Sequence, residues 1–244
     1  MQIIEIQNVS KIFNKKKKAL DNISLSIKKN ELFGLLGING AGKTTLINIL
    51  TGLIKKTSGK IYVNGLDIDK RMWKIKRMIN CSPQETALAP NLTVKQNIEF
   101  FASVYDIKDL TEADHIVDKF KLRPIYDQKA KTLSGGWQRK LSIAIALITG
   151  AQILFLDEPT LGLDVFSRRE LWDIILELKQ DRTIILTSHY LQEIEALCDR
   201  VAVLSNGHVL TVGTVEELKK TKHTKDFEEA FMETVKKGEN EKSV

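Results

Sequence analysis

The chain has 244 residues, of which 43% are hydrophobic and 28% charged, so it is long enough for one globular domain with a subdomain. Cys81 and Cys198 have no metal-ligand spacing, no signal-peptide pattern is present, and the apolar run 141–156 is too short to span a membrane. These features exclude disulfide-rich and membrane-spanning classes and favour a chain that is soluble by itself. The net charge of +6 comes largely from residues 15–18, residues 70–77 and the C-terminal segment; it favours solvated faces but would also suit an anionic membrane leaflet.

Strand patterns dominate the first third of the chain. Residues 3–6 and 23–27 have short strand patterns, and the lysines between them, at 15–18, suit an exposed connection. Residues 61–63 form a further strand, which ends in an Asn-Gly turn. We therefore expect an N-terminal antiparallel β subdomain.

A glycine-rich loop follows a predicted buried strand at residues 32–36. The loop, Gly37-Ile38-Asn39-Gly40-Ala41-Gly42-Lys43-Thr44, precedes a helix predicted from about Lys43 to Thr51. Its glycines let successive N–H groups point inward and form an anion nest at a helix N-terminus. Lys43 can then reach the β- and γ-phosphates of a nucleotide, and the Thr44 hydroxyl can ligate Mg²⁺. The sequence therefore predicts nucleotide contacts from Gly37, Asn39, Gly40, Ala41, Gly42, Lys43, Thr44 and Thr45.

The pattern becomes helical between residues 86 and 131. This region is polar, with apolar side chains at helical spacing, such as Phe100, Phe101, Val104 and Tyr105. Strong strand patterns resume only at residues 153–156, 183–186 and 201–204. Strands that alternate with helices indicate a parallel sheet covered on both faces. The expected fold class is α/β: a P-loop NTPase (RecA-like) parallel sheet core with the N-terminal antiparallel β subdomain and an inserted α-helical subdomain.

The chain ends in an amphipathic pattern. Phe227, Phe231 and Val235 recur four residues apart among acidic residues, which predicts a helix. We expect this helix to pack back on the domain rather than to serve as a free binding motif, and residues 236–244 to be frayed. The expected division is an ATPase domain at 1–220 and a C-terminal helix with a tail at 221–244.

Polar residues follow two of the predicted strands. Asp157 ends the apolar run 153–156, and Glu158 comes next; His189 follows the strand at 183–186. Ligands collect beyond the carboxyl ends of parallel strands, so Asp157 can reach a Mg²⁺ shell there. Glu158 can orient or deprotonate an attacking water, and His189 can hold the γ-phosphate and the water in register.

The segment Leu133-Ser134-Gly135-Gly136-Trp137 narrows the class of protein. Ser134, Gly135 and Gly136 place a hydroxyl and exposed N–H groups at a predicted helix start, which makes a second anion site. Together with the phosphate loop and Asp157-Glu158, this segment resembles the signature of ABC ATPases. Trp137 departs from the family pattern, in which Gln is usual. Packing at the dimer interface and space-filling in the helical subdomain are both open for Trp137.

The resemblance covers nearly the whole chain and implies further roles. In the family, MgATP is the substrate and the signature of one subunit serves the γ-phosphate bound by a second subunit. Gln84 matches the glutamine that links the Mg²⁺–water site to the membrane partner, and Asp164 lies in a segment that resembles the D-loop. Phe13 falls where an aromatic residue stacks on adenine, although core packing is an alternative for it. The helical subdomain with the signature would span 86–140.

Within this family the chain is most similar to ATP-binding subunits that drive export of drugs, antibiotics, peptides, lipids or sodium ions. Residues 92–98, 157–164 and 227–231 carry that likeness. The resemblance implies an integral membrane permease as partner, a homodimer of ATPase subunits, and a location at the cytoplasmic face of the cell membrane. An importer ATPase is the next interpretation. A soluble ABC ATPase acting on nucleic acid or ribosomes is the third, and we expect no nucleic-acid partner.

Overall fold

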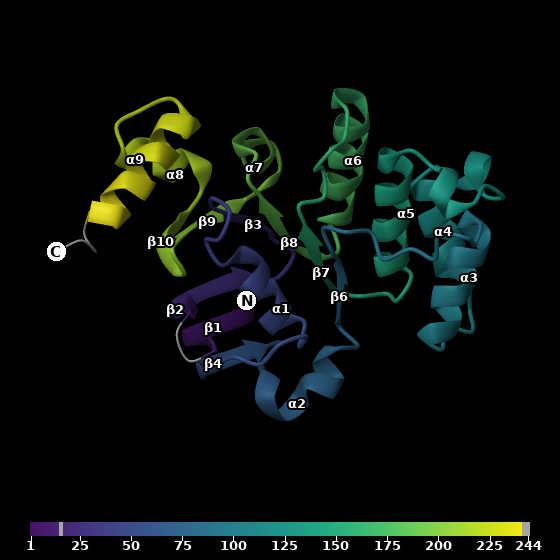
Figure 1. Cartoon of the computed structure of the whole chain (residues 1–244), viewed down its shortest axis with the longest axis horizontal. Helices are drawn as coiled ribbons and strands as arrows, with labels where there is room; N and C mark the ends of the chain where they lie inside the picture. The colour runs from purple at the N-terminus through teal and green to yellow at the C-terminus, as the bar shows by residue number, and fades with distance from the viewer. Residues whose placement is uncertain (15–16, 241–244) are drawn as a thin grey trace.

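A computed structural model describes residues 1–14 and 17–240, and a six-stranded sheet runs through its centre (Figure 1). The strand order is β10-β9-β3-β8-β7-β6, and all neighbours pair in parallel except β9 and β10. The bounds are Leu32–Leu36 for β3, Ile79–Ser82 for β6, Ile153–Asp157 for β7, Thr183–Ser188 for β8, Arg200–Ser205 for β9 and His208–Gly213 for β10. This arrangement confirms the predicted parallel core.

The residues of β3 alternate between two cores, one on each face of this sheet. Leu32 and Leu36 pack into the core that includes the buried side of the helical region, whereas Phe33 and Leu35 pack into the core under the N-terminal strands. The successive side chains of a strand point to opposite faces, so a strand that is buried on both faces has to be apolar throughout. This is why β3, β7 and β8 contain almost uninterrupted apolar runs.

A second, antiparallel sheet of order β2-β1-β4-β5 is formed by the N-terminal part of the chain, as predicted. Its strands are β1 (Gln2–Phe13), β2 (Lys17–Lys28), β4 (Ser58–Val63) and β5 (Leu66–Asp67). The expectation of an exposed connection at 15–18 is wrong for Lys17 and Lys18, because they start β2 and pair with Phe13 and Ile12. Residues 15 and 16 lie outside the described part of the chain.

Helices cover the parallel sheet and form a separate group at one end of the molecule. The sheet is flanked by α1 (Lys43–Leu50), α6 (Val165–Leu178) and α7 (Leu191–Leu197), and α2 (Ile68–Ile75) lies beside β4 and β5. The group at the end consists of α3 (Val94–Val104), α4 (Thr111–Lys119) and α5 (Gly135–Leu147) (Figure 1). None of the helices in the described ranges is both long enough and apolar enough to cross a membrane.

The C-terminal helices lie at the opposite end of the molecule from this group (Figure 1). They are α8 (Val215–Thr221) and α9 (Phe227–Asn240), and Phe227 and Phe231 are buried in the same core as α6 and α7. The structure confirms that α9 packs back on the domain. Fraying from residue 236 is wrong as far as Asn240, where α9 ends; residues 241–244 lie outside the described part.

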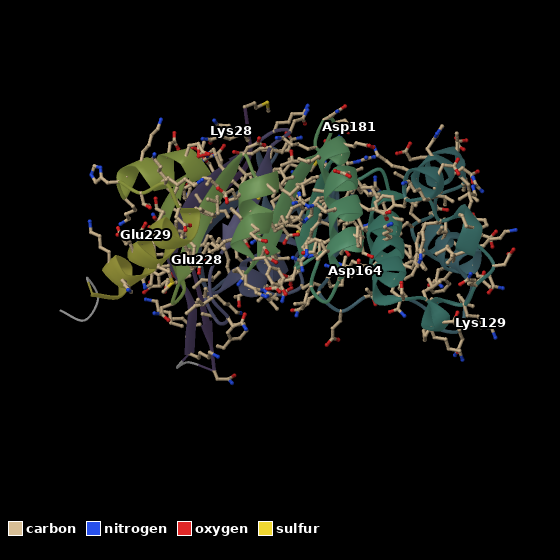
Figure 2. The ribbon with its side chains drawn as sticks, turned by 90° about the horizontal axis from the view of Figure 1, so that it is seen from above. Lys28, Lys129, Asp164, Asp181, Glu228 and Glu229 are labelled. Atoms are coloured by element: carbon tan, nitrogen blue, oxygen red, sulfur yellow. The ribbon has the colours of Figure 1, made fainter. Side chains whose placement is uncertain are left out.

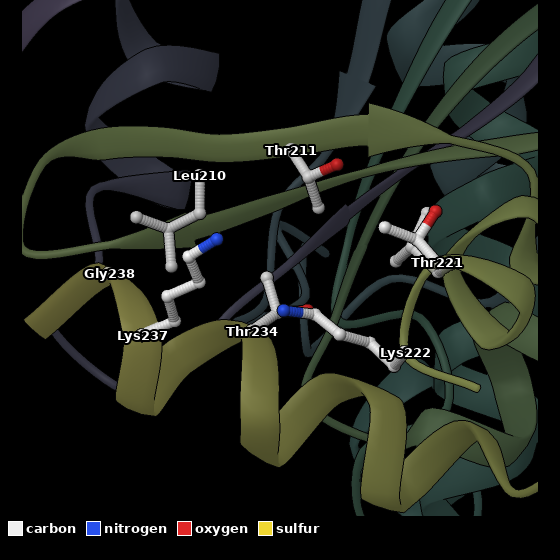
Figure 3. Close-up of a pocket in the computed structure, with 8 residues that line it drawn as sticks. Leu210, Thr211, Thr221, Lys222, Thr234, Lys237 and Gly238 are labelled. Atoms are coloured by element: carbon white, nitrogen blue, oxygen red, sulfur yellow. The ribbon is translucent and has the colours of Figure 1, made fainter. Parts of the chain in front are cut away.

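Where α9 crosses β10, a small pocket of about 230 Å³ remains. Figure 3 shows residues of β10, the end of α8 and α9 converging on it. A Cβ at Gly238 would lie 2.5 Å from Leu210 Cδ2, so a side chain at residue 238 would require Leu210 to move.

Candidate nucleotide-binding site

A pocket of about 810 Å³ lies beyond the carboxyl ends of β3, β7 and β8. These ends meet because the three strands are parallel neighbours, which is where ligands collect in open α/β sheets. Residues that are distant in the sequence therefore face one cavity. Of the predicted site residues, the lining contains Phe13, Asn39, Gly40, Ala41, Gly42, Lys43, Thr44, Thr45, Gln84, Glu158 and His189.

The glycine loop has a backbone that only glycine fits well. Gly40 and Gly42 have φ values of +83° and +109°, and Gly42 is the N-cap of α1. Gly37 lies behind the pocket rather than in its lining, and a Cβ there would lie 2.4 Å from the Leu204 carbonyl oxygen. The loop thus presents N–H groups at a helix N-terminus, an arrangement that binds phosphate.

Lys43 lies folded into this loop. Its side chain is buried, and Nζ donates to the carbonyl oxygens of Gly37 at 2.5 Å and Ile38 at 3.4 Å. Burial lowers the pKa of the Lys43 ammonium, and the carboxylates of Glu158 and Asp157 oppose this shift. The ammonium is therefore poorly hydrated, and an anion would compensate its charge.

The end of β7 places two carboxylates at the inner wall. Asp157 is 5% exposed and lies beneath the pocket lining, where its Oδ1 accepts from Thr187 Oγ1 at 2.5 Å. Glu158 reaches the pocket with a left-handed backbone, φ +50°, which non-glycine residues adopt at a cost. Thr187 stabilises this conformation, since its Oγ1 accepts from the Glu158 N–H at 3.0 Å.

His189 forms a close pair with Glu158. Its Nδ1 lies 2.7 Å from Glu158 Oε2, and the two side chains are 35% and 11% exposed. The ring also stacks at a tilt on Tyr190, with the ring centroids 4.2 Å apart. The pair lines the same pocket as the glycine loop, and a water beside Glu158 would also lie within reach of His189.

The oxygen donors at this wall fit Mg²⁺. They are the Thr44 hydroxyl, the Gln84 amide oxygen and the Asp157 carboxylate, and Mg²⁺ is usually held by one or two carboxylates together with substrate phosphates and water. In the described ranges, no group of three or more His, Cys, Asp or Glu side chains could hold a metal by itself. A site completed by phosphate oxygens agrees with both observations.

The predicted second anion site lies outside this pocket. Ser134 is the N-cap of α5, with its hydroxyl 3.5 Å from the Trp137 N–H, and Gly135 and Gly136 form the first turn. None of these three residues lines the pocket of the same chain. The N-terminus of α5 meets the start of α6 instead, because a Cβ at Gly136 would lie 3.1 Å from Ser167 Oγ.

Asp164 is the N-cap residue of α6. Its Oδ1 accepts from the N–H groups of Phe166 and Ser167, and its Oδ2 accepts from the Ser167 hydroxyl at 2.5 Å. The Ser167 hydroxyl also lowers the pKa of Asp164. Asp164 lies outside the lining of this pocket, so the nucleotide contact predicted for it stays a prediction.

Trp137 is half-buried against the helical core rather than free. Its ring packs on the core of the helical region, and Lys140 Nζ lies 4.6 Å above the ring centroid. Lys140 also forms an ion pair with Glu170 of α6 at 2.5 Å. In the single chain, the space-filling interpretation of Trp137 is therefore the one that the contacts favour.

Sequence reasoning missed Arg139, which ties the site together from α5. The side chain is 4% exposed and donates to the carbonyl oxygens of Pro83 at 2.5 Å, Asp157 at 2.6 Å and Pro159 at 2.9 Å. Burial lowers the pKa of Arg139, and Asp157 opposes the shift. The signal in the sequence was a cation at the start of an otherwise apolar helix.

Glu193 is a second residue that was missed. It is fully buried on α7, and its Oε1 accepts from Thr160 Oγ1 at 2.9 Å and Trp172 Nε1 at 3.1 Å. Burial raises the pKa of this carboxyl. The contact joins the segment after Glu158 to the helix after His189.

The fold and this pocket define a P-loop nucleotide-binding protein of the ATP-binding cassette type. The family model described as ABC transporter matches residues 20–161. Among solved structures, the chain is similar to an ATP-binding subunit of an ABC transporter, with 25% identity, a TM-score of 0.84, and coverage of 95% of this chain and 99% of that one. It is also similar to a dimeric cassette in a post-hydrolysis state bound to ADP and Pi, with 25% identity, a TM-score of 0.78, and coverage of 86% and 98%.

Curated relatives agree with this class. The chain is 40% identical to the mouse phospholipid-transporting ATPase ABCA3 over 86% of its own length, and 43% identical to ABC transporter A family member 7 of Dictyostelium discoideum over 88%. It spans 13% and 26% of the lengths of these two relatives. The chain belongs to the ABC transporter family and is an ATPase domain of that family.

Proposed function

We propose that this chain binds MgATP and hydrolyses it to drive transport through a separate membrane-spanning partner. The observation that carries the proposal is the Glu158–His189 pair, 2.7 Å apart, in the same pocket as Lys43 and the glycine loop. A general base for water and an anion nest for the γ-phosphate are two of the elements that phosphoryl transfer to water uses.

Each residue has one task in this scheme. The loop N–H groups and Lys43 bind the phosphates, and Phe13, which also lines the pocket, stacks on adenine. Glu158 takes the proton of the attacking water, while His189 holds the Glu158 carboxylate and the γ-phosphate in register. Thr44, Gln84 and Asp157 would hold Mg²⁺, whose charge offsets the negative charge that develops on the phosphate oxygens.

Glu158→Gln tests the catalytic part. The amide keeps the shape of the side chain but cannot accept the proton, so turnover should fall by about 10²–10⁴-fold while ATP affinity stays close to that of the parent. Glu228→Gln, on the exposed face of α9, is the matched control (Figure 2). Hydrolysis at the parental rate in Glu158→Gln would contradict the assignment.

We infer that two copies of the chain complete two sites head to tail. The support is that Ser134, Gly135 and Gly136 form a helix start suited to an anion, and that none of the three lines the pocket of their own chain. With ATP, the Glu158→Gln chain should therefore form a homodimer in light scattering, and Ser134→Ala should weaken it. A Glu158→Gln chain that stays monomeric at saturating ATP would overturn the dimer.

The membrane partner is proposed to dock on the helical region, between the end of α3 and the start of β6. A groove of about 440 Å³ there is lined by Tyr105, Ile107 and Ile79 together with Lys76 and Arg77. Beside it on α3, Phe100 and Val104 are 49% and 61% exposed and lie one turn apart, so they form an apolar patch next to the groove. This docking would place the chain at the cytoplasmic face of the membrane.

Co-purification tests the docking surface. Phe100→Ser with Val104→Ser should lose a multispanning partner that co-purifies with the parent, while ATP binding is retained. Met232→Ser, which changes a side chain of similar exposure on α9, should keep the partner. ATP-dependent function without any membrane partner would contradict the proposal and favour a soluble ABC ATPase.

The proposed direction is export, which rests on the sequence likeness of residues 92–98, 157–164 and 227–231. One relative is named a phospholipid-transporting ATPase, so a labelled phospholipid is the first cargo to test. With the co-purified partner in proteoliposomes, the cargo should move away from the side that holds ATP and this chain. Movement toward that side would identify an importer.

A further inference from the structure

One surface segment of this chain carries a large excess of positive charge. Residues 53–78 contain eight Lys and Arg and two Asp, an excess that equals the net charge of +6 for the whole chain. The charges of the remainder, which includes the lysine run at 15–18, sum to zero. Five of these cations lie on or directly after α2, at residues 70–77.

The α2 cations face solvent without acidic partners. Lys70, Arg71, Lys74, Lys76 and Arg77 are all exposed, and none of them takes part in an ion pair within the described ranges. The nearby Asp69 is already paired with Lys56 at 2.6 Å. Figure 1 shows α2 at the margin of the molecule, beside the N-terminal sheet. Its apolar anchors, Ile68 and Ile75, are buried, so the helix is held with its basic face outward.

Two large apolar side chains are exposed in the same segment. Trp73 is 55% exposed, with Lys74 Nζ 5.3 Å and Arg77 Cζ 5.7 Å from its ring centroid. Leu53 is 71% exposed on a loop that lies against α2, where a Cβ at Gly52 would meet Met72. We call the exposed cations of residues 70–77 together with Trp73 and Leu53 the α2 patch.

We propose that the α2 patch binds the surface of a bilayer that contains anionic phospholipid. Unpaired cations on a short helix are attracted to anionic headgroups, and a Trp flanked by cations suits the headgroup level, where one part of the ring is apolar and its N–H is wet. The exposed Leu53 favours a bilayer over nucleic acid as the ligand. A bilayer can bury the apolar leucine side chain, whereas a phosphate backbone offers it no apolar surface.

The position of the patch agrees with such a contact. Lys76 and Arg77 also line the groove between α3 and β6 where the membrane partner is proposed to dock. That agreement rests on the proposed function, whereas the charge and the exposed apolar side chains do not. The lipid contact can therefore be tested on the chain without its partner.

Vesicle flotation is the direct test. The full chain should bind vesicles of phosphatidylcholine with phosphatidylserine, fail to bind phosphatidylcholine alone, and detach at high salt because exposed charges are screened. The triple variant Lys70→Gln, Arg71→Gln, Lys74→Gln should bind anionic vesicles on the order of 100-fold more weakly. Trp73→Ala should weaken binding about tenfold.

A charge-matched control separates the patch from general basicity. Lys28→Gln, Lys108→Gln and Lys129→Gln remove three exposed lysines from other surfaces, two of which are labelled in Figure 2, and should leave vesicle binding unchanged. The proposal is overturned if the parent ignores anionic vesicles, if both triple variants lose binding equally, or if the patch variant loses only DNA binding. ATP hydrolysis should be the same in all these chains, so a failure of the ATPase assignment would be seen separately.

Discussion

Arg139→Met is expected to be the most damaging single change among the residues that frame the site without entering it. Methionine keeps the length and the apolar stem of the side chain but removes every donor. The buried carbonyl oxygens of Asp157 and Pro159, now 2.6 and 2.9 Å from the guanidinium, would lose this donor, as would the part-buried carbonyl oxygen of Pro83. A hydrogen bond from a charged group contributes about 1.5–3 kcal/mol to stability. Removing the buried charge also removes its desolvation cost, which offsets part of the loss of these bonds. We expect the free energy of unfolding to fall by about 3 kcal/mol.

Urea unfolding followed by circular dichroism measures this change, and the melting temperature should fall by about 6–12 °C. Arg123→Met is the control, because Arg123 also forms two short contacts, with Asp114 and Asp118, but its side chain is 46% exposed. Water replaces such exposed pairs, so this variant should be close to the parent. If Arg139→Met loses less than about 1 kcal/mol, or no more than Arg123→Met, the buried carbonyl contacts are not what stabilises this region.

Three further changes probe separate parts of the structure. Gly42→Ala should lower ATP affinity at least about tenfold in a fluorescent-nucleotide titration, because the φ of +109° is strained and Cβ would lie 2.7 Å from Leu20; Gly65→Ala, also at a left-handed φ of +74° but outside the pocket lining, should not. Glu193→Gln should flatten the pH dependence of stability. The raised pKa of Glu193 stabilises the fold below the ordinary glutamate pKa and loses that effect as the pH rises through the raised value, so the parent's advantage should shrink with pH. Trp137→Gln should cost about 1 kcal/mol of stability and leave hydrolysis and dimer closure unchanged; a faster variant would show that the signature is tuned by this residue.

The sequence was sufficient for the parts of the site that depend on local pattern. The strand at 32–36 and the glycine loop were predictable because a strand buried on both faces must be apolar and an anion nest requires glycines. The meeting of Lys43, Glu158 and His189 was predictable as well, since parallel strands bring their carboxyl ends to the same edge.

The rest depends on tertiary contacts that no local pattern encodes. The partners of Arg139 are main-chain oxygens at 83, 157 and 159, and any residue type supplies such an oxygen. Helical spacing showed that Phe100 and Val104 share a face of α3, but which face is buried depends on α5 packing against the other side. The left-handed backbone of Glu158 is held by Thr187 of a neighbouring strand, and this too is invisible in the sequence around Glu158.

Arg139 also bears on how the two halves of the site could act together. It lies one turn after the N-cap residue Ser134 on the rigid helix α5, and its guanidinium holds the carbonyl oxygens of Asp157 and Pro83, each next to a predicted catalytic residue. A helix that moves to meet a second nucleotide must either carry these carbonyls along or break the contacts. Because buried polar groups without a partner cost free energy, we expect the carbonyl oxygens to move with α5 rather than to lose their contacts with Arg139. We therefore expect α5 and the segments that contain Glu158 and Gln84 to move together.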